Sequence, residues 1–335
     1  MTASNTPQIS FAILCYNTER YVGECIQSVL AMNSGHDFEI VALDDHSSDG
    51  TLQTLRKFKD PRLRVIAHRK NMGHAVSIGH LLEESRGEYV ARIDSDDRYR
   101  PEFLSEAVPI LDNYSEVGLV YADACLIDSE GKRTQDSCDL VHQQRDFKGG
   151  ELIPLLHQNF ICAPTIIARR QLWLNCLPVP PSLAFHDWYF TVLMARQCEF
   201  YFRNRVLADY RVHAGNLHSR ITLDGTEEAS IFRLLQHVFQ TPETDAGHEQ
   251  KKQSQRRSVY GRQYLTLADK YFGATMNSDA RRCYWRAICN MPALTSVALL
   301  RRFTATFLPR ELYENCKSWS RFGLNSVAKT QENRA

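Results

Sequence analysis

The chain has 335 residues, of which 43% are hydrophobic and 24% are charged, proportions that are ordinary for a soluble globular protein. The N-terminal residues are polar, so a secretion signal is not expected, and no apolar run approaches the roughly 18 residues of a membrane-spanning helix. The 10 cysteines include no C-x-x-C pair and show no regular spacing. We therefore expect a cytoplasmic protein with reduced cysteines and room for one large domain or two ordinary ones.

The net charge of +1 hides an asymmetry along the chain. Residues 251–335 carry 16 Lys and Arg against 5 Asp and Glu, whereas residues 1–250 carry 24 basic and 34 acidic side chains. An acidic N-terminal region followed by a basic C-terminal region suggests two modules with different functions. We expect a first domain over residues 1–225 and a helical region over residues 226–335.

Four apolar runs near the N-terminus predict strands, at Ile9–Leu14, Phe38–Leu43, Leu63–Ala67 and Tyr89–Ile93. The runs are continuous rather than alternating, which is typical of strands that are covered on both faces. Segments with helical periodicity separate them, so the order is β-α-β-α-β-α-β. This order predicts an α/β fold with a parallel sheet and right-handed crossovers.

The remaining chain is less regular. A helix from Pro101 to Leu111 and a strand over Val117–Tyr121 are expected, followed by short strands and loops to about residue 220. The polar segment Thr241–Ser254 is predicted to be a loop or linker. Helices are expected beyond it, at Tyr260–Phe272, Asp279–Asn290 and Thr295–Leu308.

The most informative feature is a group of three carboxylates directly after the fourth strand, at Asp94, Asp96 and Asp97. Like charges this close repel each other, so a fold keeps them together mainly where a cation lies between them. At the end of a strand, the three side chains point to a divalent metal ion and, through it, to a phosphate.

Other polar residues follow the first three strands. Tyr16 and Asn17 follow the first, Asp45 the second and Asn71 the third. Ligands of open parallel sheets bind at the carboxyl ends of the strands. The chain has no G-x-x-x-x-G-K-[ST] loop and no G-x-G-x-x-G after the first strand. A metal or basic side chains must therefore neutralise a diphosphate here, which points to a nucleoside diphosphate as leaving group.

Together these segments resemble the ordered signatures of glycosyltransferase family 2, whose members are inverting enzymes of the GT-A fold. The resemblance covers roughly residues 10–219, and several spaced motifs in the family's order carry it. The motifs are Ile9–Asn17, Asp44–Thr51, Asn71–Gly73 and Gly87–Asp97.

The resemblance implies roles on the donor side of a site. Tyr16 would flank the nucleobase, and Asp45 would accept a hydrogen bond from it. Asp94 and Asp96 match the family's D-x-D, which binds the ribose and the metal, with Asp97 beside them. The remaining donor contacts would come from Asn17, Glu19 and Asn71.

One donor-side role has an alternative explanation, and one segment departs from the family pattern. Glu19 lies where the family often has an acidic residue, and a first-turn helix acid accounts for it equally well. Gly79-His80-Leu81 stands where many members have Asn-x-Gly, so contacts near the sugar differ from the family pattern.

Later motifs imply the acceptor side. His186-Asp187-Trp188 lies where the family has Glu-Asp and a further residue, and Asp187 matches the carboxylate that takes the proton of the acceptor hydroxyl. The alternative role of Asp187 is a helix cap. Tyr210-Arg211-Val212-His213 resembles the family's Y-R-x-H, so Arg211 would contact the donor diphosphate and His213 the metal.

The basic tail resembles one tetratricopeptide-like hairpin followed by an amphipathic helix. That helix carries Val297, Leu300 and Phe307 together with Arg301 and Arg302. Such a helix either lies on an anionic membrane surface or packs with a solvated basic rim. Nucleic acid is not an expected partner, because the basic residues form no recognised binding motif.

We therefore expect a glycosyltransferase that uses Mn²⁺ or Mg²⁺ and a nucleoside-diphosphate sugar, most often UDP-linked. Its acceptor would be a saccharide or a lipid-linked saccharide of surface polysaccharide assembly, at the inner face of the plasma membrane. Two alternatives stay open: a non-catalytic module that binds sugar nucleotides, and a metal-dependent nucleotidyltransferase. The latter normally has a basic, glycine-rich loop after its first strand, where this chain has Cys15–Glu19.

Overall fold

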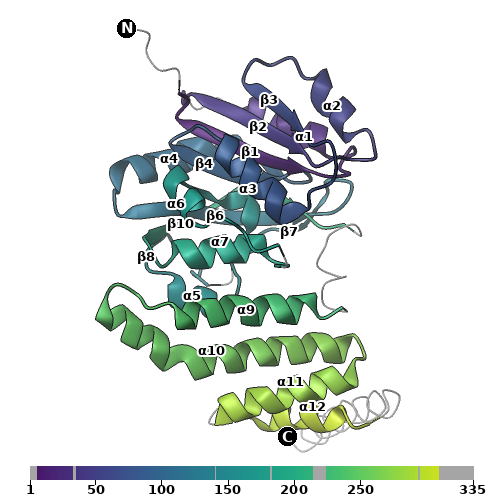
Figure 1. The fold of residues 1–335 in the computed structure, drawn as a ribbon, viewed down its shortest axis with the longest axis vertical. Helices are drawn as coiled ribbons and strands as arrows, with labels where there is room; N and C mark the ends of the chain where they lie inside the picture. The colour runs from purple at the N-terminus through teal and green to yellow at the C-terminus, as the bar shows by residue number, and fades with distance from the viewer. Residues whose placement is uncertain are drawn as a thin grey trace, which may run out of the picture. The chain divides into compact units, whose positions relative to one another are not determined.

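The computed structural model describes residues 6–32, 35–139, 141–181, 183–213, 224–292 and 295–308. The chain divides into two compact units, Met1–Ser219 with Phe232–Glu243, and Arg220–Ile231 with Thr244–Ala335. Helix α9 (Thr226–Gln240) contributes residues to both units. Figure 1 shows the elements of each unit.

A 10-stranded sheet forms the centre of the first unit, with β3-β2-β1-β4-β9-β6-β10-β5 as its main order and β7 and β8 paired to β6 and β10. Strands β1 to β4 are mutually parallel, as the sequence predicts, while β9 runs antiparallel to both β4 and β6 and makes the sheet mixed. The strands are β1 Ile9–Cys15, β2 Phe38–Asp44, β3 Leu63–Ala67, β4 Tyr89–Asp94, β5 Arg98–Tyr99, β6 Val117–Ile127, β7 Arg133–Gln135, β8 Phe147–Gly149, β9 Ile167–Arg169 and β10 Glu199–Arg211.

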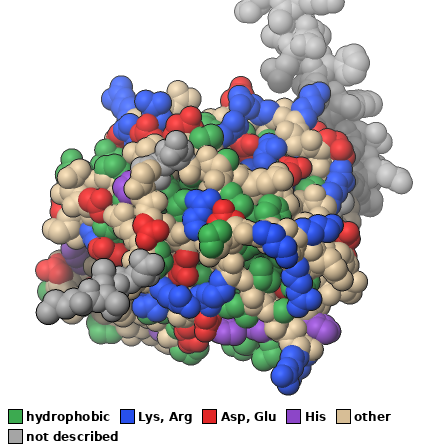
Figure 2. Space-filling view, turned by 90° about the horizontal axis from the view of Figure 1, so that it is seen from above, with side chains coloured by type: hydrophobic (Ala, Val, Ile, Leu, Met, Phe, Trp, Pro, Cys, Tyr) green, Lys and Arg blue, Asp and Glu red, His purple; other side chains and the backbone are tan. Residues whose placement is uncertain are grey.

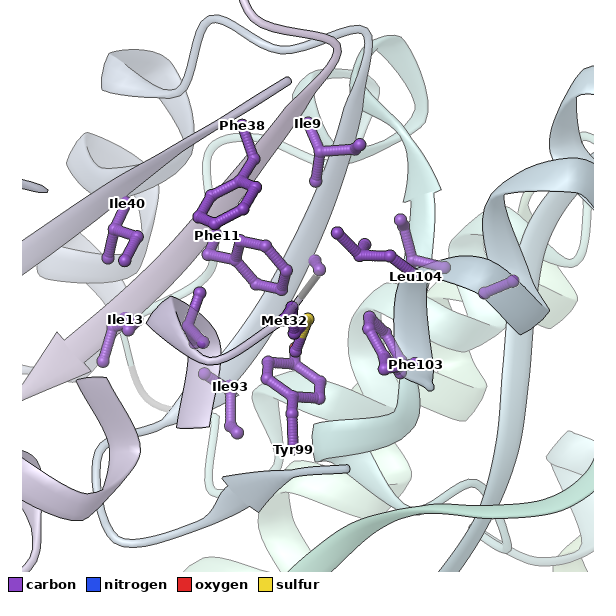
Figure 3. Close-up of a cluster of buried hydrophobic side chains, with 14 of the residues drawn as sticks. Ile9, Phe11, Ile13, Met32, Phe38, Ile40, Ile93, Tyr99, Phe103 and Leu104 are labelled. Atoms are coloured by element: carbon purple, nitrogen blue, oxygen red, sulfur yellow. The ribbon is translucent and has the colours of Figure 1, made fainter. Parts of the chain in front are cut away.

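Helices cover both faces of this sheet, which explains why every residue of β1 is buried. On one face, Phe11 and Ile13 of β1 belong to a core with residues of α1, α2 and α4. The Phe11 ring lies 5.4 Å from that of Phe38 and 5.3 Å from that of Tyr99, and Figure 3 shows this cluster. Burying each such side chain contributes about 1.5–3 kcal/mol. The helices of this unit are α1 Val22–Leu30, α2 Thr51–Lys57, α3 His74–Glu84, α4 Phe103–Asn113, α5 Leu152–His157, 3-10 helix η1 Ala163–Thr165, α6 Arg170–Asn175 and α7 His186–Met194.

The second unit is helical, with α10 (Ala246–Gly273), α11 (Asn277–Asn290) and α12 (Val297–Ala305). The predicted loop over Thr241–Ser254 is wrong for its larger part, because α10 already begins at Ala246. Asp245 caps this helix by accepting a hydrogen bond from the His248 amide at 2.7 Å. The first turns of α10 are polar on all sides, so helix propensity and capping form them without the apolar periodicity that marks a helix in a sequence.

Charged side chains of both signs are interspersed on the face that Figure 2 shows, rather than gathered in one patch. An exposed ion pair such as Arg133–Asp136, at 3.4 Å, contributes about 0–1 kcal/mol. The stability of the first unit therefore rests on its apolar core. Within the described ranges, no helix is both long and apolar enough to cross a lipid bilayer.

Candidate active site

The carboxyl ends of the first four strands meet at one edge of the sheet. Pairing in register places Cys15 beside Asp44, Leu14 beside Asp94, and Asp44 beside Ala67. The polar residues that follow these strands are therefore neighbours, as their order in the sequence predicts. A hydrogen bond of 2.8 Å between the hydroxyls of Thr18 and Ser95 joins the loop after β1 to the turn after β4.

The turn after β4 holds the three predicted carboxylates. Asp97 is buried, and its Oδ1 accepts a hydrogen bond from the Arg211 amide at 2.7 Å. Its Oδ2 is buried and makes no hydrogen bond with the part of the chain that the structure describes. Asp96 lies closer to the surface, with Oδ2 at 3.0 Å from Nε2 of His213. Asp94 pairs with the guanidinium of Arg92, two residues before it on the same face of β4.

The charges of this turn are only partly balanced. Burial raises the pKa of Asp97 well above its ordinary value, and the carboxylates of Asp96 and Asp94 raise it further. Burial and Asp94 also raise the pKa of Asp96, against the opposing effect of His213. Carboxyls in this condition gain stability when a cation approaches them. In the described ranges, however, no group of three or more His, Cys, Asp or Glu is arranged to hold a metal ion by itself.

Arg211 ends β10 and ties it to the aspartate turn. Its side chain is buried, with Nε donating to the carbonyl oxygen of Asp96 at 2.7 Å and a terminal nitrogen donating to Glu24 at 2.8 Å. The guanidinium also lies over the Tyr21 ring, 4.6 Å from its centre. His213 packs on the same ring at 5.0 Å. The structure thus brings Arg211 and His213 to the aspartate turn, while the contact of Arg211 with a diphosphate stays a prediction.

The loop after β1 carries Tyr16, Asn17 and Glu19. Tyr16 is 50% exposed, as a ring that stacks on a ligand requires. The side-chain oxygen of Asn17 accepts the Ser48 amide at 2.8 Å, and Glu19 accepts the Gly50 amide at 2.8 Å. Asn17 and Glu19 therefore hold the turn that leads into α2. Their contact with a donor stays a prediction.

Asp45 and Asn71 are brought together by the entry into α3. The buried carboxylate of Asp45 accepts the Met72 amide at 2.9 Å and the Gly73 amide at 3.0 Å. Asn71 also accepts from the Gly73 amide, at 3.0 Å. Gly73 has a φ of +79°, a conformation that residues with a side chain rarely adopt. The predicted base-binding carboxylate is thus also the clamp of this loop.

Asp187 lies in the first turn of α7, where the helix dipole favours a negative charge. Its Oδ2 accepts a hydrogen bond from Nδ2 of Asn159 at 3.2 Å. The neighbouring His186 is buried and stacks on His74, with ring centres 4.1 Å apart. Burial, followed by the charges of His74 and Arg92, lowers the pKa of His186 to about 3. His186 is therefore neutral near pH 7.

The N-terminus of α7 reaches the same edge of the sheet. The ring of His186, next to Asp187, stacks on the ring of His74 at 4.1 Å, and His74 directly follows Gly73, whose amide binds Asp45. Burial also raises the pKa of Tyr210, and the charges of Asp97, Cys162, Asp94 and Asp187 add to the rise. This convergence makes the carboxyl edge of the sheet a single candidate active site.

Three residues of the site were not expected from the sequence. Arg92 had a visible signal, since it is the one charged residue within an otherwise apolar strand segment, Tyr89–Ile93. Tyr21 lies between Arg211 and His213, but in the sequence it belongs to the apolar face of a helix. His68 follows β3 directly and bonds to Asp45 at 2.8 Å, and nothing in its local sequence marks it.

Comparison with known proteins agrees with this geometry. The sequence model of a known family, Glycosyl transferase family 2, matches residues 10–177. The uncharacterized protein Rv1520 of Mycobacterium tuberculosis is 26% identical over 306 residues, which is 89% of this chain and 84% of the relative. The succinoglycan biosynthesis protein ExoO of Rhizobium meliloti is 29% identical over 197 residues, 57% of this chain and 56% of the relative.

Solved structures share the fold. Residues 1–349 of S. aureus TarS, crystallised with UDP-GlcNAc, match with a TM-score of 0.62 at 16% identity, over 84% of this chain and 81% of that chain. The mannosyltransferase PcManGT of Pyrobaculum calidifontis, in complex with GDP-Man and Mn²⁺, matches with a TM-score of 0.56 at 15% identity, over 95% and 84%. These matches confirm the predicted GT-A fold. With the family match, they show that the chain is a glycosyltransferase that belongs to glycosyl transferase family 2.

Proposed function

We propose that this glycosyltransferase is an inverting enzyme that transfers a sugar from a UDP-linked donor to a hydroxyl group of a saccharide or lipid-linked acceptor. The observation that carries the proposal is that the first turn of α7, which holds Asp187, packs through the stacked rings of His186 and His74 against the loop that Asp45 binds, at the edge of the sheet where the aspartate turn lies. Single displacement needs one carboxylate near the sugar and a separate set of groups for the leaving diphosphate. Both sets are available at this edge of the sheet.

Asp187 would act as the general base. It takes the proton of the acceptor hydroxyl as that oxygen forms its bond to C1 of the sugar, and the bond from C1 to the diphosphate oxygen breaks. The Asn159 amide, at 3.2 Å, orients the carboxylate. The nucleoside diphosphate leaves with the bonding electron pair, so the configuration at C1 inverts.

The donor would be held by the loops after β1, β2 and β4. Tyr16 covers the base, Asp45 accepts a hydrogen bond from it, and Asp94 binds the ribose. The supporting contacts come from Asn17, Glu19, Asn71 and Arg211.

A divalent cation, Mn²⁺ or Mg²⁺, fits the residues of the aspartate turn. Asp97 has a buried oxygen without a hydrogen bond in the described part of the chain, and the pKa values of Asp96 and Asp97 are raised by burial and neighbouring carboxylates. Asp96, Asp97 and His213 would hold the ion together with oxygens of the donor diphosphate. When bound, the ion neutralises the charge of the diphosphate as it departs.

The setting of the reaction is surface polysaccharide assembly at the inner face of the plasma membrane. ExoO is named for succinoglycan biosynthesis, and TarS was crystallised with UDP-GlcNAc, which supports this setting and a UDP-linked donor. Membership of glycosyl transferase family 2 argues against the alternative that the protein is a nucleotidyltransferase. The same membership argues against a non-catalytic module that only binds the donor.

The substitution Asp187→Asn tests the proposal. Because it keeps the shape of the side chain and removes its basicity, we expect transfer to fall about 10²–10⁴-fold. Donor affinity, measured by calorimetry with UDP-sugars in the presence and absence of Mn²⁺, should change less than about threefold, a loss below roughly 0.7 kcal/mol. Asp136→Asn, on an 88% exposed side chain, is the matched control and should leave both quantities unchanged.

Two outcomes would contradict the assignment. If Asp187→Asn retained transfer, Asp187 would not be the base. If the wild-type protein bound UDP-sugars but transferred none to any saccharide or lipid-linked acceptor, the proposed acceptor class would be wrong.

A further inference from the structure

A chain of hydrogen bonds leads from Asp45 toward the protein surface. Oδ1 of Asp45 lies 2.8 Å from Nδ1 of His68, and Nε2 of His68 lies 2.9 Å from Nδ1 of His80. The two rings are nearly parallel, with an interplanar angle of 6°. Three elements contribute to this chain: Asp45 follows β2, His68 follows β3, and His80 belongs to α3.

The carboxylate fixes the direction of the first hydrogen bond. An ionised carboxylate only accepts, so Nδ1 of His68 carries a proton and donates a hydrogen bond to Asp45. The bond between Nε2 of His68 and Nδ1 of His80 extends the chain to α3. His80 is left with Nε2 facing Oε1 of Glu84 at 3.9 Å.

This chain adds to the two backbone hydrogen bonds already on Asp45. Oδ1 accepts from both Met72 and His68, and Oδ2 accepts from Gly73, so the carboxylate cannot rotate. Burial raises the pKa of Asp45, but the hydrogen bonds from His68 and Met72 outweigh burial and bring that pKa below its ordinary value.

An anionic acceptor of fixed direction selects among nucleobases. Uracil and thymine offer a ring N3–H, and guanine offers N1–H, whereas cytosine and adenine present an unprotonated ring nitrogen at the same edge. A carboxylate bonds the first group and repels the lone pair of the second.

We propose that His68 is a positioning residue for nucleobase recognition and that His80 acts through it. His68 holds Asp45 ionised and aimed, so the pair sets both donor affinity and the preference for bases with a ring N–H. This inference rests on the proposed function, in which Asp45 receives the base. Neither histidine touches the sugar or the acceptor, so neither sets the rate of the chemical step.

Substitutions at both positions test the proposal. His68→Phe keeps a flat ring without the bond to Asp45, and a hydrogen bond to a charged group contributes about 1.5–3 kcal/mol, so UDP affinity should fall roughly 10–100-fold. The donor KM should rise equally while kcat stays constant. His68→Asn restores an N–H donor at the same place, and its UDP affinity should return to within about threefold of the wild-type value.

The double variant separates a relay from two independent contacts. His80→Phe should weaken UDP binding in the same direction but less, and adding it to His68→Phe should cause no further loss, because His80 acts only through His68. His36→Phe is the matched control: this histidine precedes β2 at the opposite edge of the sheet and should leave UDP binding unchanged. Calorimetry with UDP, GDP and CDP on the full chain, with melting temperatures of each variant, gives the readout.

The outcomes distinguish this inference from the proposed function. If wild-type protein binds UDP and His68→Phe binds it equally well, or if the His68 and His80 effects add, the positioning role is wrong. If the wild-type protein prefers CDP to UDP, base selection by Asp45 is wrong. If it binds none of the three nucleotides, the proposed function itself fails, and the positioning role fails with it.

Discussion

Glu151 is a buried carboxyl group that belongs to a small polar network outside the candidate active site. Its Oε1 accepts a hydrogen bond from the Tyr121 hydroxyl at 2.8 Å and lies 3.0 Å from Nε2 of His142. Burial raises the pKa of Glu151 to about 7, against the opposing hydrogen bond from Tyr121, and burial lowers the pKa of His142. Both shifts favour a neutral pair, in which the protonated carboxyl donates a hydrogen bond to Nε2 of the neutral imidazole. The network fastens the segment before β8 to β6.

We predict a pH dependence of stability from this carboxyl. Its pKa is higher in the folded state than its ordinary value of 4.5, so the folded chain binds the proton more tightly. The contribution is therefore full below pH 4.5 and is lost as the pH rises through 7. Between pH 5 and 8.5 the wild-type free energy of unfolding should fall about 2–3 kcal/mol more than that of Glu151→Gln, which has no proton to lose.

Urea unfolding at the two pH values measures this difference. Glu130→Gln removes a carboxylate whose side chain is 72% exposed, and this control should follow the wild-type curve. Equal pH slopes for the wild type and Glu151→Gln would show that the carboxyl ionises in the folded state as it does in the unfolded chain.

The sequence marks some residues of the site but not their partners. Asp94, Asp96 and Asp97 are conspicuous because three carboxylates rarely follow one strand without a ligand. His68 acts through Asp45 and His80, which reach it from other elements, and Arg92 acts through Asp94, which shares its face of β4. Their roles depend on which side chains lie beside them in the folded sheet, and a single sequence does not reveal these neighbours.

Gly87 illustrates how one residue limits the packing of whole elements. Its amide donates to the Ser10 hydroxyl at 2.8 Å, where the chain passes from α3 to β4 beside β1. A Cβ atom at this position would lie 2.5 Å from the Ser10 nitrogen and 2.6 Å from the Ile9 carbonyl carbon. These are backbone atoms of a central strand, which cannot move aside. A glycine is thus required here because the chain entering β4 lies close to the backbone of β1.

Gly87→Ala should therefore destabilise the first unit by about 1–3 kcal/mol, the usual cost of overpacking. Gly150→Ala is the matched control, because no atom lies within 4 Å of its added Cβ, and its effect should stay within about 0.5 kcal/mol. Urea unfolding of both variants against the wild type measures the difference. Comparable midpoints for the two alanine variants would disprove the steric argument.

The strands could be predicted from the sequence where helices bury both faces of the sheet. The first four strands lie within one residue of their predicted bounds, because helices on both faces require unbroken apolar runs. Strands β7 to β9 lie where short strands were expected, but their positions were not predicted, since each is three residues long and exists through its pairing with a distant strand. The start of α10 was missed for the opposite reason, because a polar helix shows no apolar period.

The C-terminal part of the chain, which carries the excess of basic residues, also carries an apolar surface on the second unit. Trp285 and Phe307 are both 57% exposed, and the Phe303 ring lies between them at 6.2 and 5.5 Å. Exposed Val297 and Leu300 belong to the same helix as Phe303. Exposed aromatic rings beside basic side chains suit the interface of an anionic bilayer, which is the partner we propose for this surface.

We predict that the full chain binds vesicles that contain anionic lipid and that Trp285→Ser with Phe307→Ser lowers this binding about tenfold or more, because two apolar side chains lose their burial in the bilayer. Tyr114→Ser, at an exposed ring of the first unit, should have no effect. Vesicle sedimentation with neutral and anionic lipid measures the binding. If the Trp285→Ser, Phe307→Ser variant bound as well as Tyr114→Ser, or if binding did not depend on lipid charge, this surface would not be a membrane-binding site.

The hydrogen bond between the Arg211 amide and Asp97 bears on the order in which parts of the protein fold. It joins positions 114 residues apart, and the same arginine holds the Asp96 carbonyl. Contacts of such long range form late, since the entropy of closing a long loop opposes them. A chain that has folded its first four strands but not β10 therefore has its carboxylates without the arginine that holds them in place. We therefore expect donor binding to require β10 and to report that the sheet has finished folding.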